Sequence, residues 1–233
     1  MLARKLLGNR VPEGAQGAGR VRSIAALYSA MARVHTVRET EIKIRISNLP
    51  ALVERLRGLG AILRGRVLER NTLYDTPDSD LRLRGCLLRV RTETPAASEI
   101  LPAGRPGAIL TAKAPVPEGR PRGYKVKLER EAILPPAPDW NAALRGLGLR
   151  PAFCYEKYRA TFRMPGLHLD LDETPVGVFL ELEGAPERID RFARALGCTA
   201  RDYIQGTYWD LYAADCRRRG RKPGNMLFRP QKS

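Results

Sequence analysis

The sequence has no long hydrophobic run and no paired cysteines, and each absence excludes a class of protein. Its apolar stretches fall short of the roughly 18 residues that a membrane-spanning helix needs. The four cysteines, Cys86, Cys154, Cys198 and Cys216, lie far apart and form no C-x-x-C pair. This spacing excludes a zinc knuckle and a disulfide scaffold, and it fits a reducing compartment. We therefore expect a cytoplasmic protein without a membrane contact.

Acidic residues are scarce only at the two ends of the chain. Residues 1–38 carry seven Lys/Arg and one acid, and residues 217–233 carry seven Lys/Arg and none. The formal net charge of +16 therefore belongs mostly to the ends and not to the central region. Such segments predict weak contact with nucleic acid at most, and no specific nucleic-acid partner is expected.

The chain length favours one main domain with two basic ends. We predict a flexible basic leader over residues 1–37, a folded domain over 38–216 and a basic tail over 217–233. Met31 precedes the first strand-like segment closely, so translation could begin at Met1 or at Met31.

Strand-like and helix-like segments alternate through the central region. Periodicity and capping residues predict helices over 48–60, 139–148 (with Asp139 as its cap), 185–197 and 201–219. Strands are predicted over 39–46, 68–76, 81–93 (a strand pair or one strand kinked at Gly85), 109–115, 123–134, 154–164, 167–173 and 177–184.

Most of these strands carry apolar residues on one face and ions on the other. The segment 39–46 alternates Ile42, Ile44 and Ile46 with two acids and then two bases. Similar alternation recurs around Arg89, Lys127 and Glu181. In one architecture, an antiparallel sheet shows its charged face to water. In the other, the sheet closes so that the charged face lines a lumen.

The charged faces hold carboxylates in i, i+2 pairs together with many Arg and Lys side chains. Paired carboxylates on one side of a strand suit hard divalent cations such as Mg²⁺ or Mn²⁺. The basic set would hold the negative charges of a polyphosphate. A single E-x-E pair more often lies on an ordinary solvent-exposed surface. The recurrence of charged pairs over several strands, however, indicates a binding face.

The motifs resemble those of the CYTH domain, the family of triphosphate tunnel metalloenzymes. The resemblance begins with "ETEIK" (39–43), and it covers roughly residues 36–213. It continues in the same order through "LRLRGCLLRVR", "LTAK", "KLERE", "EKYR" and "LDETPVGVFLELEG". It implies an α+β fold, in which a closed eight-stranded antiparallel β-barrel has a charged lumen and helices packed outside.

The resemblance also implies a role for each charged residue that matches the family pattern. The implied metal ligands are Glu39, Glu41, Asp172, Glu181 and Glu183. The implied catalytic pair, which would position a metal or the attacking water, is Glu129 and Glu131. The implied triphosphate-binding residues are Lys43, Arg45, Arg89, Arg91, Lys113, Lys127 and Arg159. Lys127 stands where relatives commonly have arginine, so it would act as a point charge.

Four functions compete at this stage. The leading hypothesis is a metal-dependent hydrolase of triphosphate-containing small molecules, such as inorganic triphosphate, thiamine triphosphate or a nucleoside triphosphate. The second is an adenylate cyclase that forms cyclic AMP and pyrophosphate. A non-catalytic polyphosphate-binding module would not need so many carboxylates, and a nucleic-acid binder is disfavoured by the location of the excess charge. We expect a small-molecule partner and a monomer or homodimer.

Overall fold

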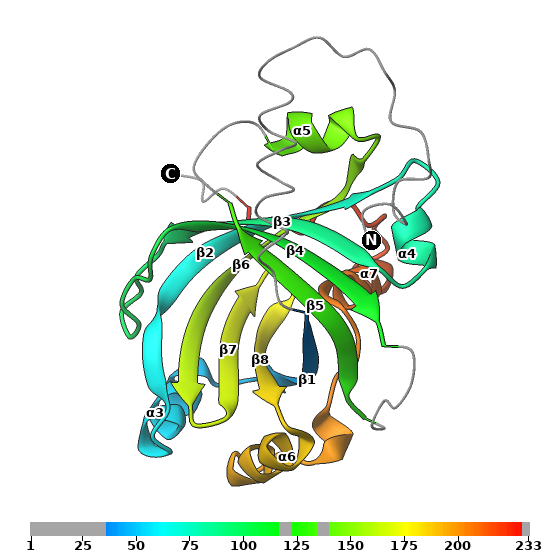
Figure 1. The fold of residues 1–233 in the computed structure, drawn as a ribbon. Helices are drawn as coiled ribbons and strands as arrows, with labels where there is room; N and C mark the ends of the chain where they lie inside the picture. Colours follow the sequence, from blue (N-terminus) through cyan, green and yellow to red (C-terminus); the bar gives the residue numbers. More distant parts are fainter. Residues whose placement is uncertain (1–35, 117–122, 135–139, 230–233) are drawn as a thin grey trace.

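A closed barrel of eight antiparallel strands forms the centre of the molecule (Figure 1). The computed structural model describes residues 36–116, 123–134 and 140–229. Around the ring the order is β1-β5-β4-β3-β2-β6-β7-β8, and β8 pairs again with β1. The strands are β1 (Val37–Ile46), β2 (Ile62–Asp75), β3 (Leu87–Pro95), β4 (Gly107–Pro115), β5 (Lys125–Ile133), β6 (Arg150–Met164), β7 (Leu167–Thr174) and β8 (Gly177–Gly184). The barrel confirms the fold implied by the family resemblance and excludes the open sheet.

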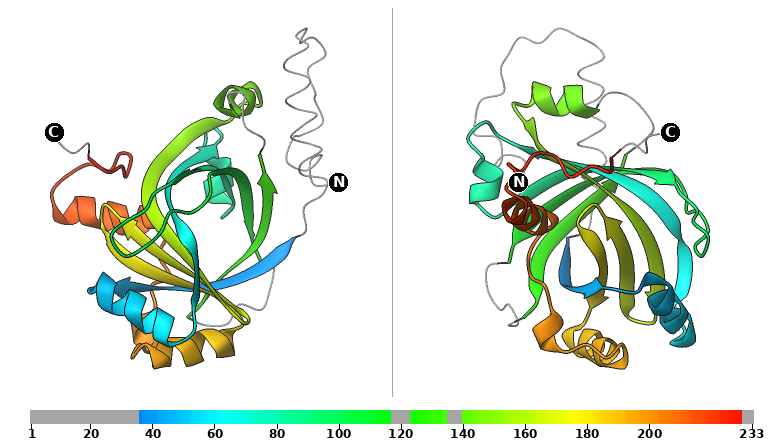
Figure 2. Two further views of the ribbon diagram at one scale, coloured as in Figure 1. Left: turned by 90° about the vertical axis from the view of Figure 1, so that its left-hand side faces the viewer. Right: turned by 180° about the vertical axis from the view of Figure 1, so that it is seen from behind.

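Helices cover the outside of this barrel. Figures 1 and 2 show α3 (Leu49–Gly58) and α6 (Pro186–Ala195) on one side of the ring, with α5 (Trp140–Gly146) on the opposite side. The remaining helical segments are α4 (Asp80–Leu83), the short 3-10 turn η1 (Ala200–Asp202) and α7 (Tyr208–Arg218). In the described part of the chain, no helix combines the length and the apolar character needed to cross a membrane.

The main hydrophobic core lies between the barrel wall and these helices. Ile42 and Ile44 of β1 are 2% and 3% exposed, and they belong to one buried cluster with Leu56 of α3 and Ile189 of α6. Burial of each such side chain contributes about 1.5–3 kcal/mol. Because side chains alternate along a strand, Glu41 and Lys43, on either side of Ile42, point into the lumen. The apolar outer face of β1 therefore determines which residues reach the site.

Several predicted elements differ from the structure: β2 and β6 begin at Ile62 and Arg150, before the predicted residues 68 and 154, and two helical segments differ more strongly. Residues 81–83 do not form a strand but belong to α4, because Asp75 Oδ1 and Oδ2 accept the backbone N–H groups of Leu81 and Arg82 at 2.8 and 3.1 Å. The helix predicted over 201–219 begins only at Tyr208. The preceding segment instead bonds to the barrel, where Ile204 N donates to Lys43 O at 2.8 Å. The predicted cap Asp139 and most of the leader lie outside the described residues.

The first part of the basic C-terminal segment packs against the barrel. Met226 is 1% exposed and bridges in parallel to Tyr155 of β6. Met226 N donates to Cys154 O at 3.0 Å, and Glu156 N donates to Met226 O at 2.9 Å. β7 pairs with β6 only from Tyr158 onward, so residues around Met226 cover the unpaired beginning of β6. An uncovered strand edge would be open to aggregation.

Replacing Met226 with alanine should therefore destabilise the barrel. Loss of a buried methionine side chain costs about 2–5 kcal/mol, and chemical denaturation would measure the change in unfolding free energy. Arg229→Ala is the matched control, since Arg229 is exposed on the same segment and a surface change is usually within about 0.5 kcal/mol. Equal stability of both variants would show that this segment does not support the fold.

Candidate functional site

A cavity of about 1540 Å³ runs through the barrel, and side chains from all eight strands line it. Asp172 of β7 is not among the lining residues. Its wall carries nearly equal numbers of Lys/Arg and Asp/Glu side chains. The lumen therefore balances most of its own charge, although the whole chain is strongly basic. A buried charge needs a partner or a ligand, so the pairing within this wall decides which groups remain available.

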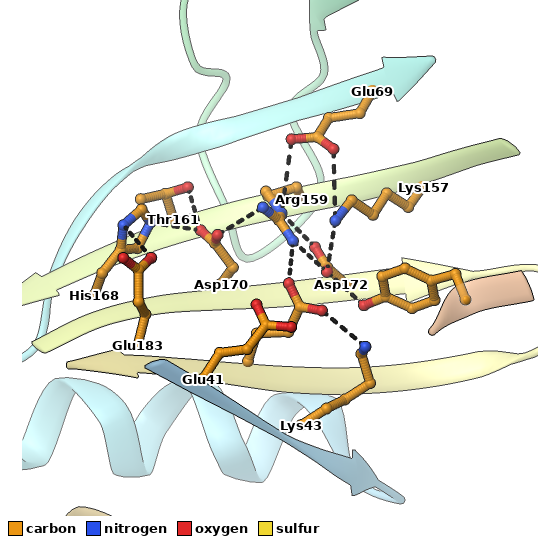
Figure 3. Close-up of polar contacts among 12 residues, drawn as sticks. Glu41, Lys43, Glu69, Lys157, Arg159, Thr161, His168, Asp170, Asp172 and Glu183 are labelled. Carbon is orange, nitrogen blue, oxygen red and sulfur yellow. Dashed lines mark hydrogen bonds and ion pairs between the residues drawn. The ribbon is translucent and has the colours of Figure 1, made fainter. Parts of the chain in front are cut away.

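Arg159 of β6 lies at the centre of a buried ionic network (Figure 3). Its guanidinium donates to Asp172 Oδ1 at 2.7 Å and forms ion pairs with Asp170 at 2.7 Å and Glu181 at 2.5 Å. Lys157, two residues earlier, donates to Asp172 Oδ2 at 2.8 Å and lies 3.5 Å from Glu69. Burial raises the pKa of Glu69, but Lys157, Arg159 and Arg91 oppose this effect and lower it to about 2. Glu69 therefore stays ionised near neutral pH, whereas burial raises the pKa of Asp172 even though Arg159 and Lys157 oppose it.

Arg89 and Arg91 of β3 form a basic row beside this network. Arg89 donates to Tyr155 Oη at 3.2 Å and to Thr111 Oγ1 at 3.1 Å. Its buried Nε–H has no hydrogen-bond partner among the described residues. Arg91 lies 3.3 Å from Glu69 and 3.6 Å from Glu131. An arginine that is 9% exposed, lines the cavity and keeps an unused donor is suited to hold an anion.

Carboxylates gather on the wall formed by β1, β5 and β8. Burial, and then contact with the Glu129 carboxyl, raise the pKa of Glu39, although Lys113 partly opposes this at 2.5 Å. Burial and the Glu39 charge likewise raise the pKa of Glu183. Lys113 also contacts Glu129 at 3.2 Å. Burial and mutual repulsion of these carboxylates therefore outweigh the lysine charge at Glu39 and Glu183.

Two further pairs connect β1 with its neighbours. Glu41 accepts a hydrogen bond from Lys125 at 2.5 Å, and Lys43 lies 3.0 Å from Glu181. Lys43 also sits 4.2 Å above the ring of Tyr208, whose hydroxyl donates to Asp172 at 2.6 Å. Lys43 is 3% exposed, so its charge is held at a fixed position in the lumen.

The carboxylates on this wall are chemically suited to bind a hard divalent cation. Glu39, Glu129 and Glu183 offer only carboxylate oxygens, and their crowding would be relieved by a cation. Among the residues that the structure describes, however, no three acidic, histidine or cysteine side chains are arranged as a ready metal centre. The carboxylates are instead held by Lys and Arg, which a cation would have to displace in part.

Most residues predicted for the site line the same cavity. These are Lys43, Arg89, Arg91, Lys113, Lys127, Arg159, Glu39, Glu41, Glu129, Glu131, Glu181 and Glu183. Lys127 is half-buried and donates to Gly85 O at 2.9 Å.

Two predicted residues are not brought to the cavity. Asp172 is fully buried, and Lys157, Arg159 and Tyr208 all donate to its oxygens, so it does not line the cavity. Arg45 is exposed, donates to Val176 O at 3.2 Å and covers the ring of Phe179 at 4.6 Å. Arg45 shares the face of Lys43 but lies near the end of β1, where a strand side chain leaves the lumen.

Several site residues were missed by sequence reasoning. Glu69 and Asn71 of β2 are both fully buried in the lumen wall. Their strand carries polar residues on both faces, with Arg70 and Thr72 outside, so no alternation indicated an inner face. Asp170 shares the face of Asp172 and lines the cavity, which makes it the accessible aspartate of β7.

His168 contacts this accessible aspartate at one end of the cavity. Its Nε2 is 3.0 Å from Asp170 Oδ1, and its Nδ1 is 3.7 Å from Glu183. Asp170 also accepts a hydrogen bond from Thr161 at 2.7 Å. The His168 side chain is partly exposed near the beginning of β7.

Solved structures share this architecture. A candidate adenylate cyclase from Vibrio parahaemolyticus aligns with a TM-score of 0.62 at 19% identity, over 76% of this chain and 98% of that chain. A protein from Pyrococcus horikoshii aligns with a TM-score of 0.62 at 21% identity, over 76% and 99%. A candidate adenylyl cyclase from Hippeastrum, described as having a dominant triphosphatase activity, gives 0.50 at 18% identity, over 79% and 97%. At these identities the likeness shows the fold.

The family assignment comes from the sequence profile. No curated protein sequence matches the chain. The CYTH domain profile matches residues 37–206, which extend from the first residue of β1 to the segment just before α7. This range includes all eight strands and the charged wall that they form. The chain therefore belongs to the CYTH domain family.

Proposed function

We propose that the protein is a divalent-metal-dependent hydrolase of triphosphate-containing small molecules. The observation that carries this proposal is the closed lumen in which Arg89, with an unused buried donor, lies across from the crowded carboxylates of Glu39 and Glu183. An arginine row would bind the non-bridging phosphate oxygens, and the carboxylate wall would hold a cation. The Hippeastrum neighbour with triphosphatase activity supports the same reaction class.

The charge balance of the lumen favours a substrate that arrives with cations. A triphosphate adds several negative charges to a wall whose acids and bases already nearly cancel. Glu39, Glu129 and Glu183 would hold Mg²⁺ or Mn²⁺, and Glu41 and Glu181 could contribute after giving up part of their Lys partners. When bound, the cation would neutralise phosphate charge and polarise the phosphoryl oxygens.

The protein's own side chains would then orient the phosphate and the attacking water. Arg159, Lys157 and Arg91 fix the positive side of the lumen, because their carboxylate partners hold them in place. Burial raises the pKa of Glu131, but Arg91 and the Thr111 hydroxyl overcome this and lower it. A weakly basic Glu131 is better suited to position Arg89 and Arg91 than to accept a proton. Glu129 and Glu39 are the better candidates to orient water.

Product analysis with the full-length protein tests the reaction class. The purified protein would be incubated with tripolyphosphate, thiamine triphosphate and ATP, with Mg²⁺ and separately with Mn²⁺, and the products resolved by chromatography. We expect release of inorganic phosphate, and EDTA should abolish it. Cyclic AMP with pyrophosphate would establish the adenylate cyclase instead, and no turnover of any substrate would contradict an enzymatic role.

Glu39→Gln tests the carboxylate wall without relying on turnover. We expect Mn²⁺ affinity, measured by calorimetry, to fall about tenfold or more, because one charged oxygen ligand is lost. Glu156→Gln is the matched control, since Glu156 lies on the outer face of the barrel and pairs with Arg70. Unchanged Mn²⁺ affinity in Glu39→Gln would show that the cation binds elsewhere.

A further inference from the structure

The lining of the cavity changes character toward one end. Charged side chains dominate most of the wall, but Leu73, Phe153 and Trp209 line the end where β2 finishes and β6 begins. A cavity of about 1540 Å³ also exceeds the roughly 300–1,000 Å³ of common small-molecule sites. The lumen therefore has room for an organic group beside a triphosphate chain.

The apolar end is directly next to the arginine row. Leu73 is in register with Arg89 on β3 and with Phe153 on β6, so the three side chains form one row across the inner face. Residues directly opposite each other in a sheet have Cβ atoms about 4.5–5.5 Å apart. The next row holds Arg91, Asn71 and Tyr155, and Tyr155 accepts the hydrogen bond from Arg89. A group joined to a phosphate at Arg89 would thus reach the aromatic rings.

The aromatic rings at this end are held in fixed positions. Phe153 meets Trp209 edge-to-face, with centroids 4.9 Å apart, and stacks on Tyr155 at 5.5 Å. Trp209 is in the first turn of α7, where Thr207 and Asp210 cap the helix reciprocally. Phe153 is 6% exposed while Trp209 is half-buried, so the indole presents surface to the cavity.

We propose that Trp209, Phe153 and Leu73 bind a planar aromatic ring system esterified to the triphosphate, and make the protein prefer such esters to inorganic triphosphate. This inference rests on the proposed triphosphate site. Stacking on a fixed aromatic side chain and apolar contact with Leu73 would hold the ring. A nucleobase and the heterocycles of thiamine share this chemistry, so both are used as probes.

Substrate preference measures the contribution of Trp209. We expect the ratio of kcat/KM for ATP or thiamine triphosphate over that for tripolyphosphate to fall about tenfold in Trp209→Leu, in line with the contribution of one stacked ring. Trp209→Phe should restore part of the ratio, and methyl triphosphate should behave like tripolyphosphate. Trp140→Phe is the control, because Trp140 lies on α5 and packs with Tyr74, Val90 and Leu110 outside the barrel wall. An unchanged ratio in Trp209→Leu would overturn the proposal.

Fluorescence separates this proposal from the proposed reaction. The sequence contains two tryptophans, so Trp140→Phe leaves Trp209 as the reporter. With Mg²⁺, the β,γ-imido analogue of ATP should quench it saturably, and tripolyphosphate should not. Ring-specific quenching without hydrolysis of any substrate would support the aromatic site and contradict the hydrolase. Equal quenching by both compounds would contradict the aromatic site even if hydrolysis is observed.

Discussion

Replacing Glu69 with glutamine is expected to lower the free energy of unfolding by about 3–5 kcal/mol, the usual cost of breaking a buried ion pair. Glu69 and Lys157 are 0% and 1% exposed, and Glu69 also faces Arg91 and Arg159. Glutamine has nearly the same shape, so the loss would come from uncompensated positive charge. Denaturant unfolding monitored by circular dichroism measures this change.

The same variant should change the response to acid. The pKa of Glu69 is lowered from 4.5 to about 2, so its ionised form stabilises the fold fully above about pH 4.5. That contribution is lost as the pH falls from about 4.5 to 2, because the unfolded chain then binds more protons than the folded one. Glu69→Gln should therefore show a shallower loss of stability over this pH range than the wild type.

A surface carboxylate provides the control for both measurements. Glu54 of α3 pairs with Arg57 at 2.8 Å, and both side chains are well exposed. Glu54→Gln should change the unfolding free energy by no more than about 0.5 kcal/mol and leave the acid response as in the wild type. If Glu69→Gln behaves like Glu54→Gln, the buried network does not stabilise the barrel.

The same network explains why Glu181 is a poor choice for testing the chemistry. Glu181 lies 3.0 Å from Lys43 and 2.5 Å from Arg159. Burial raises the pKa of Glu181, but Lys43 and Lys157 overcome this effect and hold the pKa well below its usual range. Neutralising it would remove the carboxylate that pairs with the buried Lys43 and one of those that pair with Arg159, so loss of activity could reflect loss of the fold. Glu39 has a raised pKa and crowds against another carboxylate, which makes it the cleaner position.

How much could be predicted from the sequence differed from strand to strand. β1, with Ile42 and Ile44 against charged neighbours, has one apolar face, so its inner residues were predictable. β2 is polar on both faces, and Glu69 was therefore missed. The face of the strand on which a side chain lies also does not determine whether that side chain is accessible from the cavity. Asp172 points inward, yet three donors saturate it, and this depends on the register of β6 against β7.

The helical segments show a second limit of sequence patterns. The region 201–219 was predicted as one helix, but a backbone bond between Ile204 and Lys43 joins its first part to β1, and Thr207 caps the helix only afterwards. This contact places Gly206 so that Lys43 Nζ donates to its carbonyl oxygen at 3.4 Å. Propensity cannot anticipate such a tertiary contact, although here it fixes a residue of the proposed phosphate site.

Arg89→Lys is expected to lower kcat/KM for tripolyphosphate by about 10²–10³, the usual cost of losing one preorganised charge-stabilising donor. Lysine keeps the positive charge but cannot reproduce a guanidinium that holds Tyr155 and Thr111 while its buried Nε–H remains unused. Steady-state release of phosphate measures the effect, and Mn²⁺ affinity should be unchanged because the carboxylate wall is intact.

Arg70→Lys is the matched control for this prediction. Arg70 lies on the outer face of β2, is more than half exposed and pairs with Glu156 at 2.7 Å, so its replacement should leave turnover unaltered. A rate for Arg89→Lys within a few-fold of Arg70→Lys would mean that charge alone suffices at this position. The guanidinium geometry of Arg89 would then contribute little to turnover, and its positive charge would be the property that holds the phosphate.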